Sequence, residues 1–183
     1  MGFRDWLPGS NESPQEAADR LRGEALSDPG AVDTARLVDL FREAETDSVA
    51  RTAAKGIEAV ARERPDRLAE QVSALLSGAG TIDGVGADHR AELAVAVQRV
   101  AEVDPDAVAA HADALMESLE RELQADERPG HEVRLDGRKA AALCRAVGAA
   151  GVSEARPLLL KLRRRHGPDV GEAAEDAIQE LSD

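Results

Sequence analysis

Residues 47–63 read DSVARTAAKGIEAVARE, and this stretch decides the expected fold. Its apolar residues, among them Ala53, Ile57 and Val60, recur three and four positions apart with charged residues between them. That spacing places one apolar stripe along an α-helix. Residues 31–44, which precede this stretch, show the same spacing of apolar residues. We therefore expect a pair of amphipathic helices here, 31–44 followed by 47–63.

The pattern of residues 47–63 recurs three times along the chain. Shifts of 40, 87 and 121 residues carry Ile57 onto the apolar residues Val97, Cys144 and Ile178, with matching neighbours each time. Self-similarity of this kind is typical of repeat proteins, whose stacked units bury a continuous core. The predicted helices are a leading helix, 14–26, and four pairs: 31–44 with 47–63, 66–77 with 87–103, 105–124 with 137–150, and 153–166 with 169–181.

Composition favours the same fold class. The chain has 183 residues, with 35 Ala and 19 Leu against 22 Val, Ile and Thr and three aromatic residues. Ala and Leu are strong helix formers, whereas β-branched and aromatic residues suit sheets, so a large sheet is nearly excluded. We expect an all-α chain that forms one domain, 13–183, after a flexible segment, 1–12. Its approximate repeats are 30–64, 65–103, 104–150 and 151–183.

The last unit resembles a HEAT repeat of the PBS-lyase type. The resemblance rests on Pro157 in its first helix, on Asp169 and Val170 opening its second helix, and on the Ala-rich sequence that follows. It implies a right-handed α-α superhelix, a HEAT-like solenoid, that acts mostly as a scaffold for partner proteins. Smaller groups of such proteins bind nucleic acid or act on bilin chromophores or DNA bases. Arg51 and Arg138 lie near a position where these repeats often carry Arg, and Glu172 departs from it.

Charge indicates the cellular setting. Asp and Glu number 36 against 23 Lys and Arg, which gives a net charge of -13, and only three of the basic residues are Lys. An excess of surface carboxylates keeps a protein hydrated in concentrated salt. We therefore expect a halophilic archaeal protein. An acidic protein from a bacterium with a GC-rich genome is the alternative.

The sequence offers no catalytic or metal-binding pattern. Cys144 is the single cysteine and occupies an apolar repeat position, which predicts a small core residue in a reducing cytoplasm. The four His residues have no ligand at a recognised metal spacing. The first residues lack an apolar signal core, and no stretch is apolar enough to span a membrane. We expect a cytoplasmic protein that is not an enzyme, with no cofactor and no metal.

The second helix of each pair carries an outward strip, which the resemblance places on the concave face. The repeat register assigns to it Arg51, Lys55, Glu58 and Arg62, then Ala91, Val95, Gln98 and Glu102, then Arg138, Ala142, Arg145 and Ala149, then Glu172, Asp176, Gln179 and Asp183. The alternative is a solvated face on which Glu58 pairs with Arg62 four residues later. The predicted partner-binding residues are Arg51, Lys55, Arg62, Arg138, Lys139 and Arg145, and we expect a protein partner.

Residues 131–166 form a basic segment in this acidic chain. They hold nine basic and three acidic residues, a net charge of +6. Such a segment suits an acidic protein, neighbouring acidic repeats, or nucleic acid, the last being the alternative function. Against nucleic acid stand the overall charge and the lack of aromatic residues between the arginines.

Three further segments differ from the repeat pattern. Phe3 and Trp6 either seal the first repeat or dock on another molecule. The glycine-rich stretch 78–86 lacks the strand and the Lys of a phosphate loop, so we expect an interhelix loop. The insertion 125–136 is read as a linker or a contact loop.

Overall fold

The computed structural model of the protein describes residues 12–80, 84–125, 137–165 and 167–182. Within these residues all regular structure is helical and there is no strand, so the expected all-α class is confirmed. The elements are α1 (Pro14–Ser27), α2 (Thr34–Arg42), α3 (Asp47–Glu63), η2 (Pro65–Gln71), α4 (Val72–Ala79), η3 (Ala87–His89), α5 (Arg90–Val103), α6 (Pro105–Ala109), α7 (Ala112–Ala125), α8 (Gly137–Ala149), η4 (Ser153–Ala155), α9 (Arg156–Arg165) and α10 (Pro168–Glu180).

Side-chain caps explain why several helices begin where they do. At α1 the Ser13 hydroxyl accepts a hydrogen bond from the Glu16 N–H, and the Glu16 carboxylate accepts one from the Ser13 N–H. At α3 the Thr46 hydroxyl accepts a bond from the Val49 N–H. These caps satisfy backbone donors that have no partner inside the helix. The prediction for 47–63 is confirmed at both ends.

Four predicted helices are divided in the structure, and two of them, 87–103 and 153–166, begin with the short 3-10 segments η3 and η4. The prediction of a single helix over 105–124 is wrong, because α6 ends at Ala109 and α7 begins at Ala112. The His111 N–H bonds to the Val108 carbonyl, three residues back, so the chain tightens there before it resumes the α-helical pattern. The predicted helix 66–77 is split between η2 and α4, and it begins at Pro65 as a 3-10 segment.

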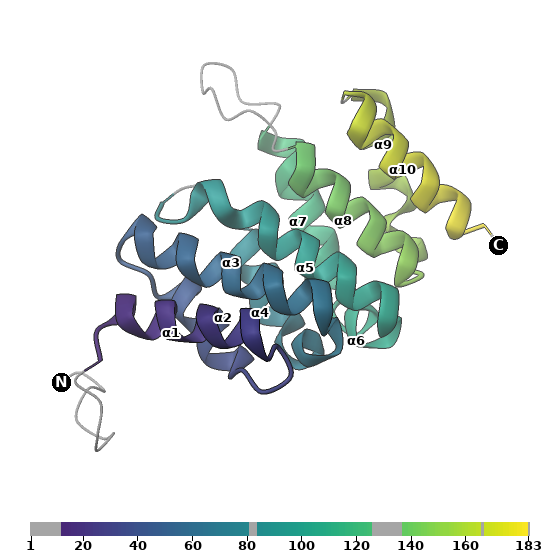
Figure 1. Ribbon diagram of the computed structural model, residues 1–183. Helices are drawn as coiled ribbons and strands as arrows, with labels where there is room; N and C mark the ends of the chain where they lie inside the picture. The colour runs from purple at the N-terminus through teal and green to yellow at the C-terminus, as the bar shows by residue number, and fades with distance from the viewer. Residues whose placement is uncertain (1–11, 81–83, 126–136, 166, 183) are drawn as a thin grey trace.

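The helices lie in two layers (Figure 1). We call α1, α3, α5, α8 and α10 the front layer, because they pack side by side in that order and lie toward the viewer. The back layer contains α2, α4, α6, α7 and α9. In it, α2, α4, α7 and α9 each pack on the front helix that follows in the sequence. Neighbouring front helices pack closely along their lengths, whereas α2, α4, α7 and α9 contact one another at fewer points.

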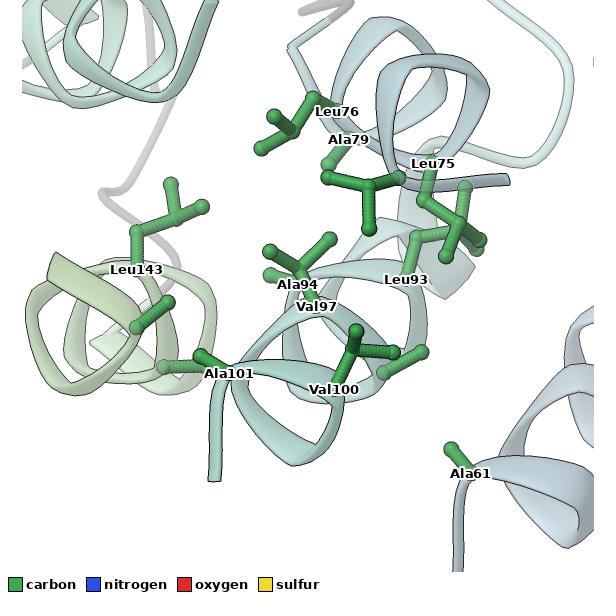
Figure 2. Packing of buried hydrophobic residues seen from close by; sticks show 14 of the residues in the cluster. Ala61, Leu75, Leu76, Ala79, Leu93, Ala94, Val97, Val100, Ala101 and Leu143 are labelled. Atoms are coloured by element: carbon green, nitrogen blue, oxygen red, sulfur yellow. The ribbon is translucent and has the colours of Figure 1, made fainter. Parts of the chain in front are cut away.

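The core between the layers consists mainly of Ala, Leu and Val side chains. In Figure 2, Leu75, Leu76 and Ala79 of α4 lie beside Leu93 and Val97 of α5, and all five are buried. The buried apolar residues form one continuous cluster that runs from α1 to α10. Small side chains let the helices approach closely, so close packing replaces the large aromatic residues that the chain lacks.

Glycine sets the spacing between α8 and α10. A Cβ atom built on Gly148 would lie 2.9 Å from the Cα of Ala177 and 2.2 Å from the Glu180 Oε2. Both distances are below van der Waals contact, so the two helices cross at a distance that only Gly allows at this position.

Candidate partner-binding surface

Each front-layer helix leaves one stripe of residues open, on the side opposite its buried residues. On α3 this stripe is narrow, because α1 and α5 flank the helix and α2 packs behind it. We call the open stripes of α3, α5, α8 and α10 the front face. Its described residues are Arg51, Lys55, Glu58, Arg62, Ala91, Val95, Gln98, Glu102, Arg138, Ala142, Arg145, Ala149, Glu172, Asp176 and Gln179. The predicted strip also included Asp183, which lies outside the described residues.

The front face is cationic at α3 and α8 and acidic at α10. Arg51, Lys55 and Arg62 of α3 and Arg145 of α8 are exposed. Within the described part of the chain, no ion pair involves Arg51, Lys55 or Arg145. In contrast, the sequence of α10 contains no basic residue. Part of the front face thus carries exposed cations in a protein with a net charge of -13, as the back-layer helix α9 also does.

Two predicted strip residues are not exposed. Ala91 is 4% exposed and Ala142 is 1% exposed, although the register places both on open stripes. Ala142 belongs to the continuous apolar core, whereas Ala91 is buried without belonging to it. The prediction that these two residues face outward is therefore wrong.

Arg138 lies at the start of α8 and contacts acids of two other helices. Its Nη1 atom donates a hydrogen bond to the Glu92 Oε1 of α5 at 3.2 Å. Its Nη2 atom lies 3.7 Å from the Glu58 Oε1 of α3, and α3 and α8 lie on opposite sides of α5. Arg138 is thus at the front face as predicted, and it is already held by two carboxylates of the same chain.

Lys139 belongs to the predicted set of partner-binding residues, but the structure places it inside the molecule. Its side chain is 8% exposed, and its Nζ lies 2.5 Å from the Glu122 Oε1 of α7. The Nζ also donates a hydrogen bond to the Ala79 carbonyl at 3.1 Å, at the end of α4. A cation suits a helix C-terminus, where backbone carbonyls lack partners. Lys139 therefore ties α4, α7 and α8 together inside the molecule and is not available to a partner.

The pair of Glu58 with Arg62, which belonged to the alternative of a solvated face, does not form in the structure. Glu58 faces Arg138, and the Arg62 Nε donates a hydrogen bond to the adjacent Glu63 at 3.2 Å. The contact of Glu58 with Arg138 and that of Arg62 with Glu63 are both exposed or half-buried, so each contributes little to stability. Arg62 remains 66% exposed at its side chain.

The described residues of the basic segment 131–166 do not form one patch. Its cations are divided between the front face at α8, the buried pair of Lys139, and α9 in the back layer. On α9, Arg156, Lys161 and Arg164 are exposed, and Arg163 pairs with Glu175 of α10. Arg134 lies outside the described residues. The sequence pattern placed these charges together only because the residues are adjacent along the chain.

Catalytic groups are sparse in the described part of the chain. Cys144 is buried, and this burial raises the pKa of its thiol to about 12. The His89 Nε2 atom lies 3.6 Å from the Asp47 Oδ2 atom. No three His, Cys, Asp or Glu side chains of the described residues form a cluster that suits a metal ion. No described helix is long and apolar enough to cross a membrane.

A cleft of about 460 Å³, which no sequence pattern predicted, is lined by residues outside the front face. It forms where the end of α2 meets α4 and the start of α5. Its lining is mostly polar and consists of Phe41, Arg42, Glu43, Ala44, Ser77, Gly78, Val85 and Arg90. Ser77 and the buried Arg90 both have further partners. The cleft has no pair of groups suited to acid–base or nucleophilic chemistry.

Several sequence predictions fall wholly or partly outside the described residues. Phe3 and Trp6 are among them, as are residues 126–136 of the insertion 125–136, whose first residue, Ala125, ends α7. Of the glycine-rich stretch, Gly78 and Ala79 complete α4, and Gly86 has a φ of 76° before η3. Residues 81–83 lie outside the description.

Comparison of the chain with protein-family models, with curated proteins and with solved structures finds no match.

Proposed function

We propose that the protein is a non-enzymatic scaffold with a HEAT-like, right-handed solenoid architecture, and that the front face is its concave binding surface for a partner protein. The repeat register and the two-layer order of the helices support the architecture. Close packing in the front layer and sparser contacts in the back layer fit a stack that curves toward the front.

One observation carries the functional part of the proposal. The exposed Arg51, Lys55 and Arg145 have no ion pair among the described residues, and the repeat register puts them on the same face of a protein with a net charge of -13. A group of cations on one face attracts a partner surface of opposite charge. The alternative is a solvated surface without a partner, as the exposed cations of α9 would also have.

The lack of exposed aromatic side chains among the described residues favours a protein partner over nucleic acid. Phe41 is the only aromatic side chain in the described residues, and it is 5% exposed. Single-stranded nucleic acid is usually held by bases stacked on exposed aromatic rings and by a continuous basic groove. The described surface has no such ring, and the basic segment is divided between two layers.

The test is affinity capture from lysate of the source cells with two matched variants. One variant carries Arg51→Glu, Lys55→Glu and Arg145→Glu on the front face. The control carries Arg156→Glu, Lys161→Glu and Arg164→Glu on α9, which changes the same residue types and the same net charge in the back layer. A protein that is retained by the wild type and the control and lost from the front-face variant supports the proposal. Equal retention by all three chains contradicts it.

We also propose that this scaffold works in a cytoplasm of high salt concentration. The net charge of -13 supports this setting, because self-repulsion is screened within a few ångströms at high ionic strength. Thermal unfolding at increasing KCl tests it. The melting temperature should rise steadily with salt, and an unchanged melting temperature would remove the halophilic reading.

A further inference from the structure

The two ends of the front face carry opposite charges at matching positions of the repeat. A shift of 121 residues carries Arg51 of α3 onto Glu172 of α10. The same shift carries Lys55 onto Asp176, and all four side chains are exposed. Among the described residues, none of the four forms an ion pair. The front face therefore has a cationic end at α3 and an acidic end at α10.

Distance keeps these two ends from pairing within one molecule. In the front layer, α5 and α8 lie between α3 and α10. Packed helices lie about 8–10 Å apart, so the axes of α3 and α10 are roughly 25–30 Å apart. An ion pair needs its charged atoms within about 4 Å of each other. A second molecule, in contrast, can bring a cationic end and an acidic end together.

We propose that the partner of the front face is a second copy of this chain, which packs face to face with the first about a two-fold axis. This inference rests on the proposed function, because it names the occupant of the same surface. The axis lies in the plane of the face, along the helices and between α5 and α8. It places α3 of each copy over α10 of the other copy, so each contact forms twice.

The direction of the helices and their charges select this axis. A back-layer helix returns the chain between successive front helices, so the front helices run in the same direction. An axis along them keeps matching repeat positions at the same level. Arg51 then lies opposite Glu172 of the second copy, and Lys55 lies opposite its Asp176. An axis across the helices would instead place α3 over α3 and α10 over α10, where like charges repel.

The middle of the face is compatible with the same arrangement. The stripe of α5 lies opposite the stripe of α8 in the second copy, and the register pairs Ala91 with Arg138, Val95 with Ala142, Gln98 with Arg145, and Glu102 with Ala149. None of these four pairs sets two charges of the same sign against each other. Arg138 keeps its contacts with Glu92 and Glu58, and the arrangement needs no further contact from it. On a concave face the outer helices stand forward, so the charged stripes of α3 and α10 meet the second copy first.

Sedimentation velocity of the purified full chain at increasing concentration tests the inference. It is run in about 0.5 M KCl, which screens the repulsion between two acidic molecules more than it screens contacts at ion-pair distance. We expect the wild type to change from monomer to dimer as the concentration rises.

Charge reversal at the two ends gives the decisive variants. The α3 variant carries Arg51→Glu and Lys55→Glu, the α10 variant carries Glu172→Lys and Asp176→Lys, and the swapped variant carries all four changes. Each double variant turns attraction into repulsion at four contacts of the dimer. The concentration at which half of the chains are dimeric should therefore rise at least about tenfold. The swapped variant should dimerise like the wild type, and a mixture of the two double variants should form mixed dimers.

A control variant carries Arg156→Glu and Lys161→Glu on α9. It changes the same residue types and the same net charge as the α3 variant, and it should dimerise like the wild type. All the replaced side chains are exposed, so circular dichroism should show an unchanged fold in every chain. A wild type that stays monomeric at every concentration overturns the inference. An α3 variant that dimerises as well as the control, or a swapped variant that does not recover the dimer, overturns it too.

Failure of this inference differs from failure of the proposed function. If the wild type is monomeric while the front-face variant still loses a different captured protein, the partner is not a second copy and the proposed face stands. If the front-face variant loses nothing in the capture experiment, the proposed function fails and this inference fails with it.

Discussion

Replacing Lys139 by Met tests the internal role that the structure gives this residue. The change removes the ammonium that faces the Glu122 carboxylate, and it removes the donor to the Ala79 carbonyl. Glu122 is 4% exposed at its side chain, so its charge is poorly solvated once the lysine is gone. Breaking a buried ion pair by removing one partner costs about 3–5 kcal/mol. We expect a loss of about 3 kcal/mol or more in the free energy of unfolding.

The assay is denaturant unfolding followed by circular dichroism, with a double variant as the control. Lys139→Met together with Glu122→Leu removes both charges and fills the space with apolar atoms. Replacing a buried pair by apolar residues is often neutral or stabilising, so the double variant should recover most of the loss. A matched surface change, Lys161→Met on α9, should alter stability by less than about 0.5 kcal/mol. The reasoning is refuted if Lys139→Met costs no more than Lys161→Met, or if the double variant is less stable than the single one.

Three further results are expected. Gly148→Ala should lower the free energy of unfolding by about 1–3 kcal/mol, because the added Cβ collides with Ala177 and Glu180. Gly23→Ala on α1 should raise the free energy of unfolding by about 0.5–1 kcal/mol, because nothing lies within 4 Å of its added Cβ. Thermal melts of both variants measure these changes. Cys144 should resist a thiol reagent in the folded protein at neutral and mildly alkaline pH, since its pKa of about 12 keeps the thiol protonated, and should react only on unfolding. Rapid labelling of the native protein would contradict the burial of Cys144. The hydrogen bonds from Ser13 lower the pKa of Glu16 below 4.5. Their stabilising effect is therefore present above that pH and is lost as the pH falls through the lowered pKa. Glu16→Gln should lose less free energy of unfolding between neutral and acidic pH than the wild type does.

The regular parts of the fold were predictable from the sequence. The apolar period and the threonine cap mark residues 47–63, and α3 has these bounds. The proline after Ser13 and the capping box likewise mark the start of α1. These signals are local, so one sequence is enough to read them. The break between α6 and α7 has no such signal, because Ala110 and His111 contain neither the ring of Pro nor the freedom of Gly.

The candidate site was predictable only in part. The repeat register identified the exposed Arg51, Lys55 and Arg145, since register fixes which side of a helix a residue occupies. It did not identify the partners of charged residues, which depend on distances between helices. Glu122 is 17 positions before Lys139 and on another helix, and nothing in their spacing pairs them. Ala91 and Ala142 lie at open positions by register, yet both are buried.

Site-specific photo-crosslinking tests the central claim most directly. A photoreactive residue is placed at Lys55 on the front face, and in a second chain at Lys161 on α9 in the back layer. Both positions are exposed, so the probe should leave the fold intact in each case. After irradiation in lysate of the source cells, we expect a discrete adduct with one protein from position 55 and none from position 161. Adducts from position 161 alone, or the same adducts from both positions, would contradict binding at the front face.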